Sequence, residues 1–351
     1  MDREPENYAY YRLPGQHGYT FVAQTREEPT ILDSVTELNG REGFVMAPFA
    51  VSEQHPVLLM HPDVVETHEI ETQTLHESSP TAVTEQATQK VAYAADFNKF
   101  HAETQTGKFD KIVLSRCAQV ALPNGTTAKA LFEKACTLYP QQFTALVSMQ
   151  KAGTWLMATP EALLDGRHDE WHTMAVAGTM KREASTHDVA KTVWSKKNRE
   201  EQLYVSTYIK EILNQYSDTV SEHGPYTTTA AHLLHLRTDF TFRLNDAGNI
   251  GTLIEALYPT PAVCGIPKEA ARAFITAHES VDRKYYSGFC GPLSLQGETH
   301  LYVALRCMEM LGNTLRLYAG GGILRDSEMK SEWQETQTKM QTMLRLLNTQ
   351  P

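Results

Sequence analysis

Beyond residue 90, apolar positions recur with the periods of helices and strands, and they define most of the expected elements. Segments 142–149 and 153–158 alternate as a pair of strands, and a turn at Gly312 and Asn313 joins another pair. Because strands and helices mix without a regular strand–helix–strand order, the pattern favours an α+β architecture over a doubly wound sheet. Helices are predicted at 91–107, 127–140, 188–214, 268–279 and 331–344, and strands at 110–120, 142–149, 153–158, 299–310 and 313–320.

The stretch 61–90 is polar and rich in Thr, Glu, Ser and His. It predicts an irregular connection, or a weak boundary between an N-terminal part and the remainder. A chain of 351 residues can form one large domain or two, and it is long enough to bury a sizeable core.

In the last predicted helix, the charged residues lie beside the core instead of on the solvent face. Successive residues rotate by about 100° around a helix, which places Glu332, Glu335 and Lys339 along one edge of the apolar stripe. The stripe consists of Met329, Trp333, Met340, Met343, Leu344 and Leu347.

A second carboxylate has a similar position in the helix predicted at 188–214. Glu201 falls inside its apolar stripe, and Asn198 lies at the edge. Either the helix is rotated and Glu201 lies at the rim, or Glu201 lines a cleft and needs a cation, a metal or strong hydrogen bonds. Two carboxylates with water suit Mg²⁺, but the pattern leaves open whether Glu201 and Glu335 meet.

Charge and cysteine content exclude several classes of protein. The net charge is −10 and the pI is about 5.8, which argues against general nucleic-acid binding. Five cysteines without C-x-x-C spacing indicate neither a disulfide framework nor a zinc ribbon, and they favour a reducing, cytoplasmic location. We find no signal peptide, and no apolar stretch approaches the roughly 18 residues of a membrane span.

Two further features could bind an anion. Gly320, Gly321 and Gly322 let a backbone approach a ligand closely, although a tight turn with positive φ explains them equally well. Arg306 lies in the apolar run of the strand predicted at 299–310, where it needs a carboxylate partner from the protein or from a ligand.

Three polar residues have simple structural interpretations when each is taken alone. Lys111 opens a predicted strand and could be an edge lysine. Glu161 follows Pro160 and could satisfy the free N–H groups of a helix start. A histidine such as His235 is more often structural than an acid–base group.

Nine segments taken together, in this order along residues 90–350, resemble the chorismate-utilising enzymes, which include isochorismate, salicylate, anthranilate and aminodeoxychorismate synthases. The resemblance implies a single domain over 1–351, with a less well-defined part at 1–90 and a catalytic core at 91–351. It also implies antiparallel β-sheets packed as a sandwich core that helices flank. The segments are DKIVLSR, ATPEALL, AVAGTMKR, SKKNREEQLYV, HLLHLRTDF, ALYPTPAVCGIPKEAA, DRKYYSGFCGPL, LYVALRC and RLYAGGGILRDSEMKSEWQETQTK.

Within this family, a lysine in the KIVLSR segment is typical of members that add water at C2 of chorismate, whereas anthranilate synthases carry glutamine. Lys111 and the segment Pro259–Thr260–Pro261 therefore imply a Mg²⁺-dependent isomerase that converts chorismate to isochorismate. Water as the nucleophile implies no amidotransferase subunit. Isochorismate feeds menaquinone, siderophore and salicylate pathways, between which the sequence does not choose.

Three alternatives remain open. A salicylate synthase makes isochorismate and then eliminates pyruvate. An anthranilate or aminodeoxychorismate synthase component needs ammonia and fits Lys111 poorly. A non-catalytic chorismate sensor would need neither Lys111 nor Glu161.

The resemblance also implies roles for individual residues. Lys111 would be the general base, with a lowered pKa, and Glu161 the general acid, with a raised pKa. Glu201 and Glu335 would hold Mg²⁺, supported by Asn198 and Glu332 one turn earlier. The residues implied to contact the substrate are Gly178, Thr179, His235, Tyr286, Arg306, Gly320, Gly321, Gly322 and Lys339.

The sequence departs from the family in the segment K-[DE]-x-x-E-H, which reads KNREEQ here. Asn198 replaces an acid and Gln202 replaces a histidine. Loss of the acid reduces the negative charge near the metal, so a weaker affinity for Mg²⁺ is expected.

Overall fold

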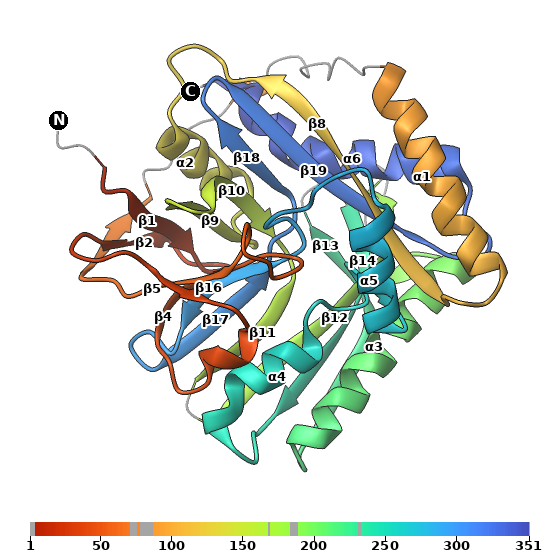
Figure 1. The fold of residues 1–351 in the computed structure, drawn as a ribbon, viewed down its shortest axis with the longest axis horizontal. Coiled ribbons are helices and arrows are strands. Elements are labelled where there is room, and N and C mark those ends of the chain that lie inside the picture. Colours follow the sequence, from red (N-terminus) through yellow and green to blue (C-terminus); the bar gives the residue numbers. More distant parts are fainter. Residues whose placement is uncertain are drawn as a thin grey trace.

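Two sheets of nine strands each form the centre of the molecule (Figure 1). The computed structural model describes residues 4–70, 76–77, 87–167, 169–182, 189–230 and 233–350. Neighbouring strands in both sheets are antiparallel. The first sheet has the order β15 (Gly265–Ile266), β8 (Lys111–Ala121), β19 (Thr314–Ile323), β18 (Cys307–Leu311), β10 (Gly153–Thr159), β9 (Phe143–Met149), β1 (Asn7–Arg12), β2 (Gly18–Gln24), β6 (Val64–Glu69). The second has the order β13 (Ser221–Ala230), β14 (Leu233–Phe242), β12 (Glu170–Lys181), β11 (Ala162–Arg167), β17 (Glu298–Val303), β16 (Phe289–Leu293), β4 (Gly43–Ala47), β5 (Val57–Met60), β3 (Thr30–Leu32).

The inner faces of the two sheets pack against each other. One apolar cluster joins strands of both, and in it the ring of Phe143 from β9 stacks on Tyr302 from β17, with centroids 4.3 Å apart. Strands such as β1, β4 and β5 are buried at every position, so both of their faces are covered. A short additional sheet pairs β20 (Thr349–Gln350) with β7 (His76–Glu77).

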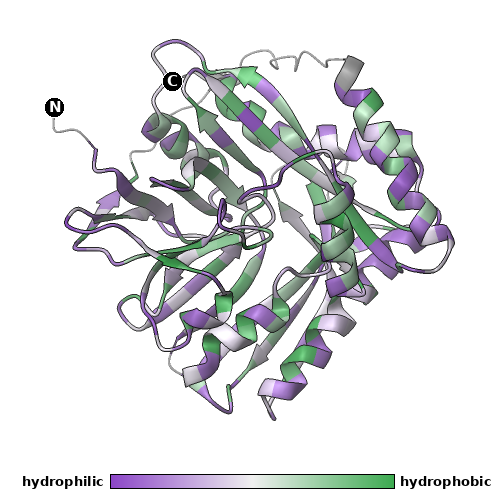
Figure 2. Ribbon diagram, in the orientation of Figure 1, coloured by the Kyte–Doolittle hydropathy of each residue, from purple (hydrophilic) through white to green (hydrophobic). Residues whose placement is uncertain are grey.

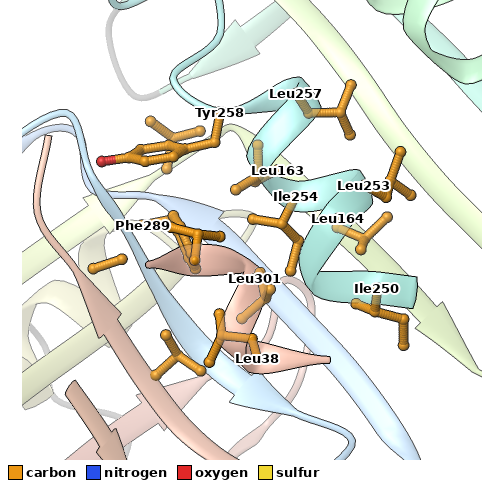
Figure 3. Packing of buried hydrophobic residues seen from close by; sticks show 14 of the residues in the cluster. Leu38, Leu163, Leu164, Ile250, Leu253, Ile254, Leu257, Tyr258, Phe289 and Leu301 are labelled. Atoms are coloured by element: carbon orange, nitrogen blue, oxygen red, sulfur yellow. The ribbon is translucent and has the colours of Figure 1, made fainter. Parts of the chain in front are cut away.

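Helices cover the outer faces of the sandwich. Apolar side chains of α2 and α6 pack on the first sheet, as do those of α1 and α5 near β8. Those of α3 and α4 pack on the second sheet, and Figure 3 shows Ile254 of α4 beside Leu163 and Leu301. The predicted α+β sandwich flanked by helices is therefore confirmed. The bounds are α1 (Ala87–Gln105), α2 (Ala128–Leu138), α3 (Lys196–Tyr216), α4 (Ile250–Leu257), α5 (Lys268–His278) and α6 (Met329–Leu347), with short 3-10 turns at Val35–Leu38, Val189–Lys191 and Ala247–Asn249.

The long helices α1 and α3 contain both hydrophobic and hydrophilic residues, as their mixed colours in Figure 2 show. No helix among the described residues has both the length and the apolar character needed to cross a membrane.

The start of α3 is set by a cap and lies later than predicted. The helix begins at Lys196, not at residue 188, because the side chain of Ser195 accepts a hydrogen bond from the backbone of Asn198 at 3.2 Å. As a result, Asn198 and Glu201 lie in the first two turns of the helix.

The predicted strand 299–310 is wrong in one respect. It is divided into β17 of the second sheet and β18 of the first, so the chain crosses between the sheets at Ala304, Leu305 and Arg306. Arg306 has φ of 47°, a conformation that an extended strand does not contain. Arg306 therefore lies at a crossing point, not within a strand.

Two other expectations also change. The turn interpretation of the three glycines is wrong, because Gly320–Gly322 belong to β19 and pair with β8 without positive φ. Part of the stretch predicted to be irregular, 61–90, forms β6, which pairs with β2. Apart from 76–77 and 87–90, positions 71–90 lie outside the described residues. The strands of residues 7–69 are divided between both large sheets.

Candidate active site

Residues of β8, β12, β14, β19, α3 and α6, together with several connections, line one cavity. With its mouth, the cavity holds about 610 Å³ of space that no protein atom occupies. Its wall also contains residues that the motifs did not single out, such as Val113, Ala262 and Tyr318. The predicted site residues that line it are Glu161, Gly178, Thr179, Glu201, His235, Tyr286, Arg306, Gly320, Gly322 and Lys339.

Lys111 and Glu201 form a buried ion pair beside the cavity. Lys111 opens β8, its side chain is 0% exposed, and its Nζ lies 2.8 Å from Oε1 of Glu201. The edge-lysine interpretation is therefore wrong, since β15 pairs outside β8. Burial alone would raise the pKa of Glu201, but the ammonium groups of Lys111 and Lys197 outweigh it and lower the pKa. Glu201 is an anion at the cavity wall.

Glu161 has the opposite electrostatic character. It lies between β10 and β11, not at a helix start, and is only 2% exposed. Burial raises its pKa to about 7, although nearby Lys111 and a hydrogen bond from Thr260 Oγ1 at 3.3 Å favour the charged form. A substantial fraction of Glu161 is therefore protonated near neutral pH and can donate a proton.

Arg306 presents a buried cation to the cavity. Burial lowers its pKa to about 10, which still leaves it charged at neutral pH. Within the described part of the chain, no ion pair with a carboxylate is found for Arg306. The internal salt bridge that the sequence left open is therefore absent there, although the charges of Glu335 and Glu161 favour the charged form of Arg306.

His235 holds the Arg306 side chain. Nη2 of Arg306 lies 3.1 Å from Nε2 of His235, and a guanidinium group can only donate. Nε2 is therefore the acceptor, which puts the ring proton on Nδ1. Nδ1 lies 3.2 Å from the carbonyl oxygen of Gly178 and 3.2 Å from Oγ1 of Thr179.

Two further carboxylates project from α6, where the helix period placed them at the edge of the core. Glu335 Oε1 lies 2.7 Å from Nζ of Lys339, which also donates to the carbonyl of Gly320 at 2.8 Å. Glu332 is 1% exposed and pairs with Lys197 of α3. Burial raises the pKa of Glu332, and Lys197 opposes this effect.

Lys197 is a site residue that the sequence pattern did not single out. It lies four residues before Glu201, on the same side of α3, which is the one signal that could have identified it. Its proximity to Glu332 depends on α3 meeting α6, and no local pattern predicts that contact.

The carboxylates of Glu201, Glu332 and Glu335 lie close to the backbone of two glycines, Gly321 and Gly322. A Cβ on Gly322 would be 2.5 Å from Oε1 of Glu201, and one on Gly321 would be 3.1 Å from Oε2 of Glu332 and 3.9 Å from Oε1 of Glu335. Gly321 thus faces α6 and does not line the cavity, in contrast to its neighbours on either side. Glycines are needed here for close approach, not for backbone conformation.

This donor set fits Mg²⁺. Oε2 of Glu332 is buried without a hydrogen-bond partner, and the available ligands are carboxylate oxygens, which this ion prefers. No cluster of three or more His, Cys, Asp and Glu side chains suited to a metal occurs among the described residues. What fits a hard cation here is the type of donor, carboxylate oxygen carried by α3 and α6.

Asn198 packs against the cavity wall at Gly178 through its backbone and Cβ. A Cβ on Gly178, which has φ of +67°, would lie 3.1 Å from both Cβ and the carbonyl oxygen of Asn198. Asn198 and Gly178 thus fix the spacing between α3 and β12. The metal-supporting role predicted for Asn198 remains a prediction.

A buried ion pair connects two walls of the cavity. Arg283, which binds Glu279 at 2.6 Å, also donates to the backbone carbonyls of Val263 and Val113 at 2.8 Å each. Because both acceptors are backbone groups, no sequence pattern identifies this contact. It fixes β8, which carries Lys111, relative to the segment that carries Thr260.

Known proteins resemble this chain in sequence. A family model described as "Chorismate binding enzyme" matches residues 35–348. Isochorismate synthase EntC from Escherichia coli is 33% identical over 274 residues, which is 75% of this chain and 68% of EntC. Isochorismate synthase MenF from Escherichia coli is 31% identical over 245 residues, or 69% of this chain and 56% of MenF.

The fold is also similar to that of solved structures. The structure of DhbC from Bacillus anthracis superposes with a TM-score of 0.84 at 24% identity, covering 99% of this chain and 97% of that one. The family match extends over most of the chain and includes every predicted site residue. This chain belongs to the chorismate-binding enzyme family.

Proposed function

We propose that the protein is an isochorismate synthase, a Mg²⁺-dependent isomerase that adds water at C2 of chorismate and expels the 4-hydroxyl. The observation that carries the proposal is the pair of Lys111 and Glu161, a potential base and a protonated acid beside one cavity. The names of relatives such as EntC and MenF, both isochorismate synthases, support the same reaction.

Binding of the substrate would rest on the cations of the cavity. Arg306, together with Tyr286, would bind the enolpyruvyl carboxylate, and Lys339 the ring carboxylate. Gly178 and Thr179 would line the ring site, and the backbone at Gly320 and Gly322 would allow the ligand to approach closely. Local cations in the cavity would therefore allow a protein with a net negative charge to bind a dianionic substrate.

Lys111 and Glu161 would carry the proton transfers. Lys111, once neutral, takes a proton from the water that attacks C2, and Glu161 gives its proton to the departing 4-hydroxyl. One water enters and one leaves, so the reaction is a net isomerisation. Glu201 and Glu335 would hold a Mg²⁺ ion, which would supply positive charge to offset that of the ring carboxylate.

Incubation with chorismate tests this function. With Mg²⁺ we expect chromatography to resolve a mixture of chorismate and isochorismate, and with EDTA we expect no conversion. Salicylate with pyruvate would instead identify a salicylate synthase. A chorismate-induced rise in melting temperature without any product would identify a sensor, and an ammonia-dependent product would refute the role of water.

Substitution of Gly322 by Ala should reduce turnover by roughly 10-fold to 100-fold and lower the free energy of unfolding by about 1–3 kcal/mol, the usual cost of overpacking. The added methyl group would lie 2.5 Å from Glu201 Oε1 and 2.8 Å from Lys111 Cε, so this buried ion pair would have to shift. Steady-state rates at increasing Mg²⁺, with a melting curve, measure both effects. Wild-type turnover would show that Glu201 does not need its present position.

A further inference from the structure

Gln202 is a buried amide on α3, directly behind the cavity wall. Its side chain is inside the protein, with the residue 1% exposed. Oε1 accepts a hydrogen bond from the backbone N–H of Ala177 at 2.8 Å. Nε2 donates to the carbonyl of Ala175 at 3.2 Å and to Oγ1 of Thr238 at 3.0 Å.

These partners leave only one orientation for the amide. A backbone N–H can only donate and a backbone carbonyl can only accept, so the oxygen of Gln202 faces Ala177 and the nitrogen faces Ala175. The residue therefore needs both an acceptor and a donor, as a neutral histidine also provides. This explains how glutamine can occupy a position at which the family pattern has histidine.

The contact lies where β12 is irregular. The register of β12 against β14 shifts between Ala177 and Thr179, which makes Gly178 the extra residue of a bulge. A bulge interrupts the ladder of hydrogen bonds and redirects the neighbouring side chains. Gln202 supplies the partner that the N–H of Ala177 requires at this interruption.

Two contacts link the bulge to Arg306. The carbonyl of Gly178 lies 3.2 Å from Nδ1 of His235, whose Nε2 lies 3.1 Å from Nη2 of Arg306. Gln202 is not among the residues that line the cavity. It acts on His235 and Arg306 through the backbone of Ala177 and Gly178.

We propose that Gln202 is a positioning residue for substrate binding: it holds the bulge at Gly178, which orients His235 and through it Arg306. The inference rests on the proposed function, in which Arg306 binds a substrate carboxylate. A carboxylate contact that persists from substrate to transition state affects KM more than kcat. Loss of the Gln202 amide therefore acts mainly on KM.

The test is a kinetic series at position 202 in the full-length protein. For Gln202→Ala we expect KM for chorismate to rise by roughly 10-fold to 100-fold, with kcat changed by less than about 3-fold. Gln202→His, which keeps an acceptor and a donor, should restore KM to within about 3-fold of the wild type. Gln202→Glu keeps the side-chain size and the bond to Ala177 but loses both donors, so its KM should be intermediate.

A buried position on the same helix provides the control. Ser206, one turn further along α3, is 8% exposed and donates to the carbonyl of Leu203 at 3.2 Å. Ser206→Ala should leave KM unchanged even if it lowers the melting temperature. An equal rise in KM in Gln202→Ala and Ser206→Ala would mean that Gln202 has only a structural role, which contradicts the proposal. A wild-type KM in Gln202→Ala would also overturn it.

A substrate-free readout separates this inference from the proposed function. In ¹⁵N spectra of histidine-labelled protein, His235 should show a neutral ring protonated on Nδ1, and Gln202→Ala should change its signals while Ser206→Ala should not. If the wild type fails to convert chorismate, the proposed function fails, but the spectra still test the link from Gln202 to His235. Unchanged His235 signals in Gln202→Ala would refute that link.

Discussion

Replacement of Lys111 by Gln should lower kcat for chorismate by about 10²-fold to 10⁴-fold, the usual contribution of a general base. Glutamine keeps a polar group near Oε1 of Glu201, where Nζ of Lys111 now lies at 2.8 Å, so the fold should survive. Rates from chromatography, together with a melting curve, separate lost chemistry from lost structure. Chorismate should still raise the melting temperature of this variant, because Arg306 and Lys339 remain.

Lys210→Gln provides the matched control. Lys210 lies on the same helix as Glu201, but it is half exposed and pairs with Glu222 at 2.8 Å. An exposed pair of this kind contributes about 0–1 kcal/mol, so both rate and stability should stay near wild type. If Lys111→Gln also kept a near wild-type kcat, Lys111 would not be the base.

Replacement of Glu161 by Gln should reduce kcat by a similar factor of about 10² to 10⁴. The amide has nearly the same shape and can keep the bond with Thr260 Oγ1, but it cannot protonate the departing hydroxyl. Because the pKa of Glu161 is raised to about 7, the acid form is lost above that pH. Wild-type kcat should therefore fall as the pH rises through about 7, and this falling limb should be missing from the residual rate of the variant.

Glu161→Gln should also change how the free energy of unfolding depends on pH, in a direction that the raised pKa of Glu161 determines. The folded-state pKa of Glu161, about 7, lies above the ordinary glutamate value of 4.5, so the folded protein binds more protons than the unfolded chain between these values. Stability from this group is present below about pH 4.5 and is lost as the pH rises through 7.

Relative to wild type, Glu161→Gln should therefore gain on the order of 3 kcal/mol between pH 4.5 and pH 8. Denaturant unfolding at both pH values measures the change. A difference between variant and wild type that does not vary with pH would contradict the raised pKa.

Local periodicity predicts much of the candidate site. The 3.6-residue period of the last helix places Glu332, Glu335 and Lys339 at the edge of a core, and the structure confirms this, with Glu332 1% exposed. The stripe of α3 places Glu201 toward the interior, where its side chain is 13% exposed. Side-chain direction in a helix follows from spacing alone, so these positions are readable without tertiary information.

Other features depend on where distant segments meet. Arg306 occupies a crossing between sheets, and an apolar run cannot reveal a change of sheet. The three glycines belong to a strand because β8 pairs with them, and their need for glycine comes from carboxylates on α3 and α6. The contacts of Lys197, Gln202 and Arg283 are equally non-local.

The sequence by itself determined the α+β class, the presence of α1, α2, α3, α5 and α6, a minority of the strands, the family, and the faces on which the charged residues lie. These properties depend on local spacing and on motifs that are contiguous along the chain. Only the tertiary structure decided which charges pair, that Arg306 has no carboxylate partner among the described residues, and that burial raises the pKa of Glu161 to about 7. Ionisation and pairing depend on the groups and the solvent within a few ångströms, and folding brings those groups together from positions far apart in sequence.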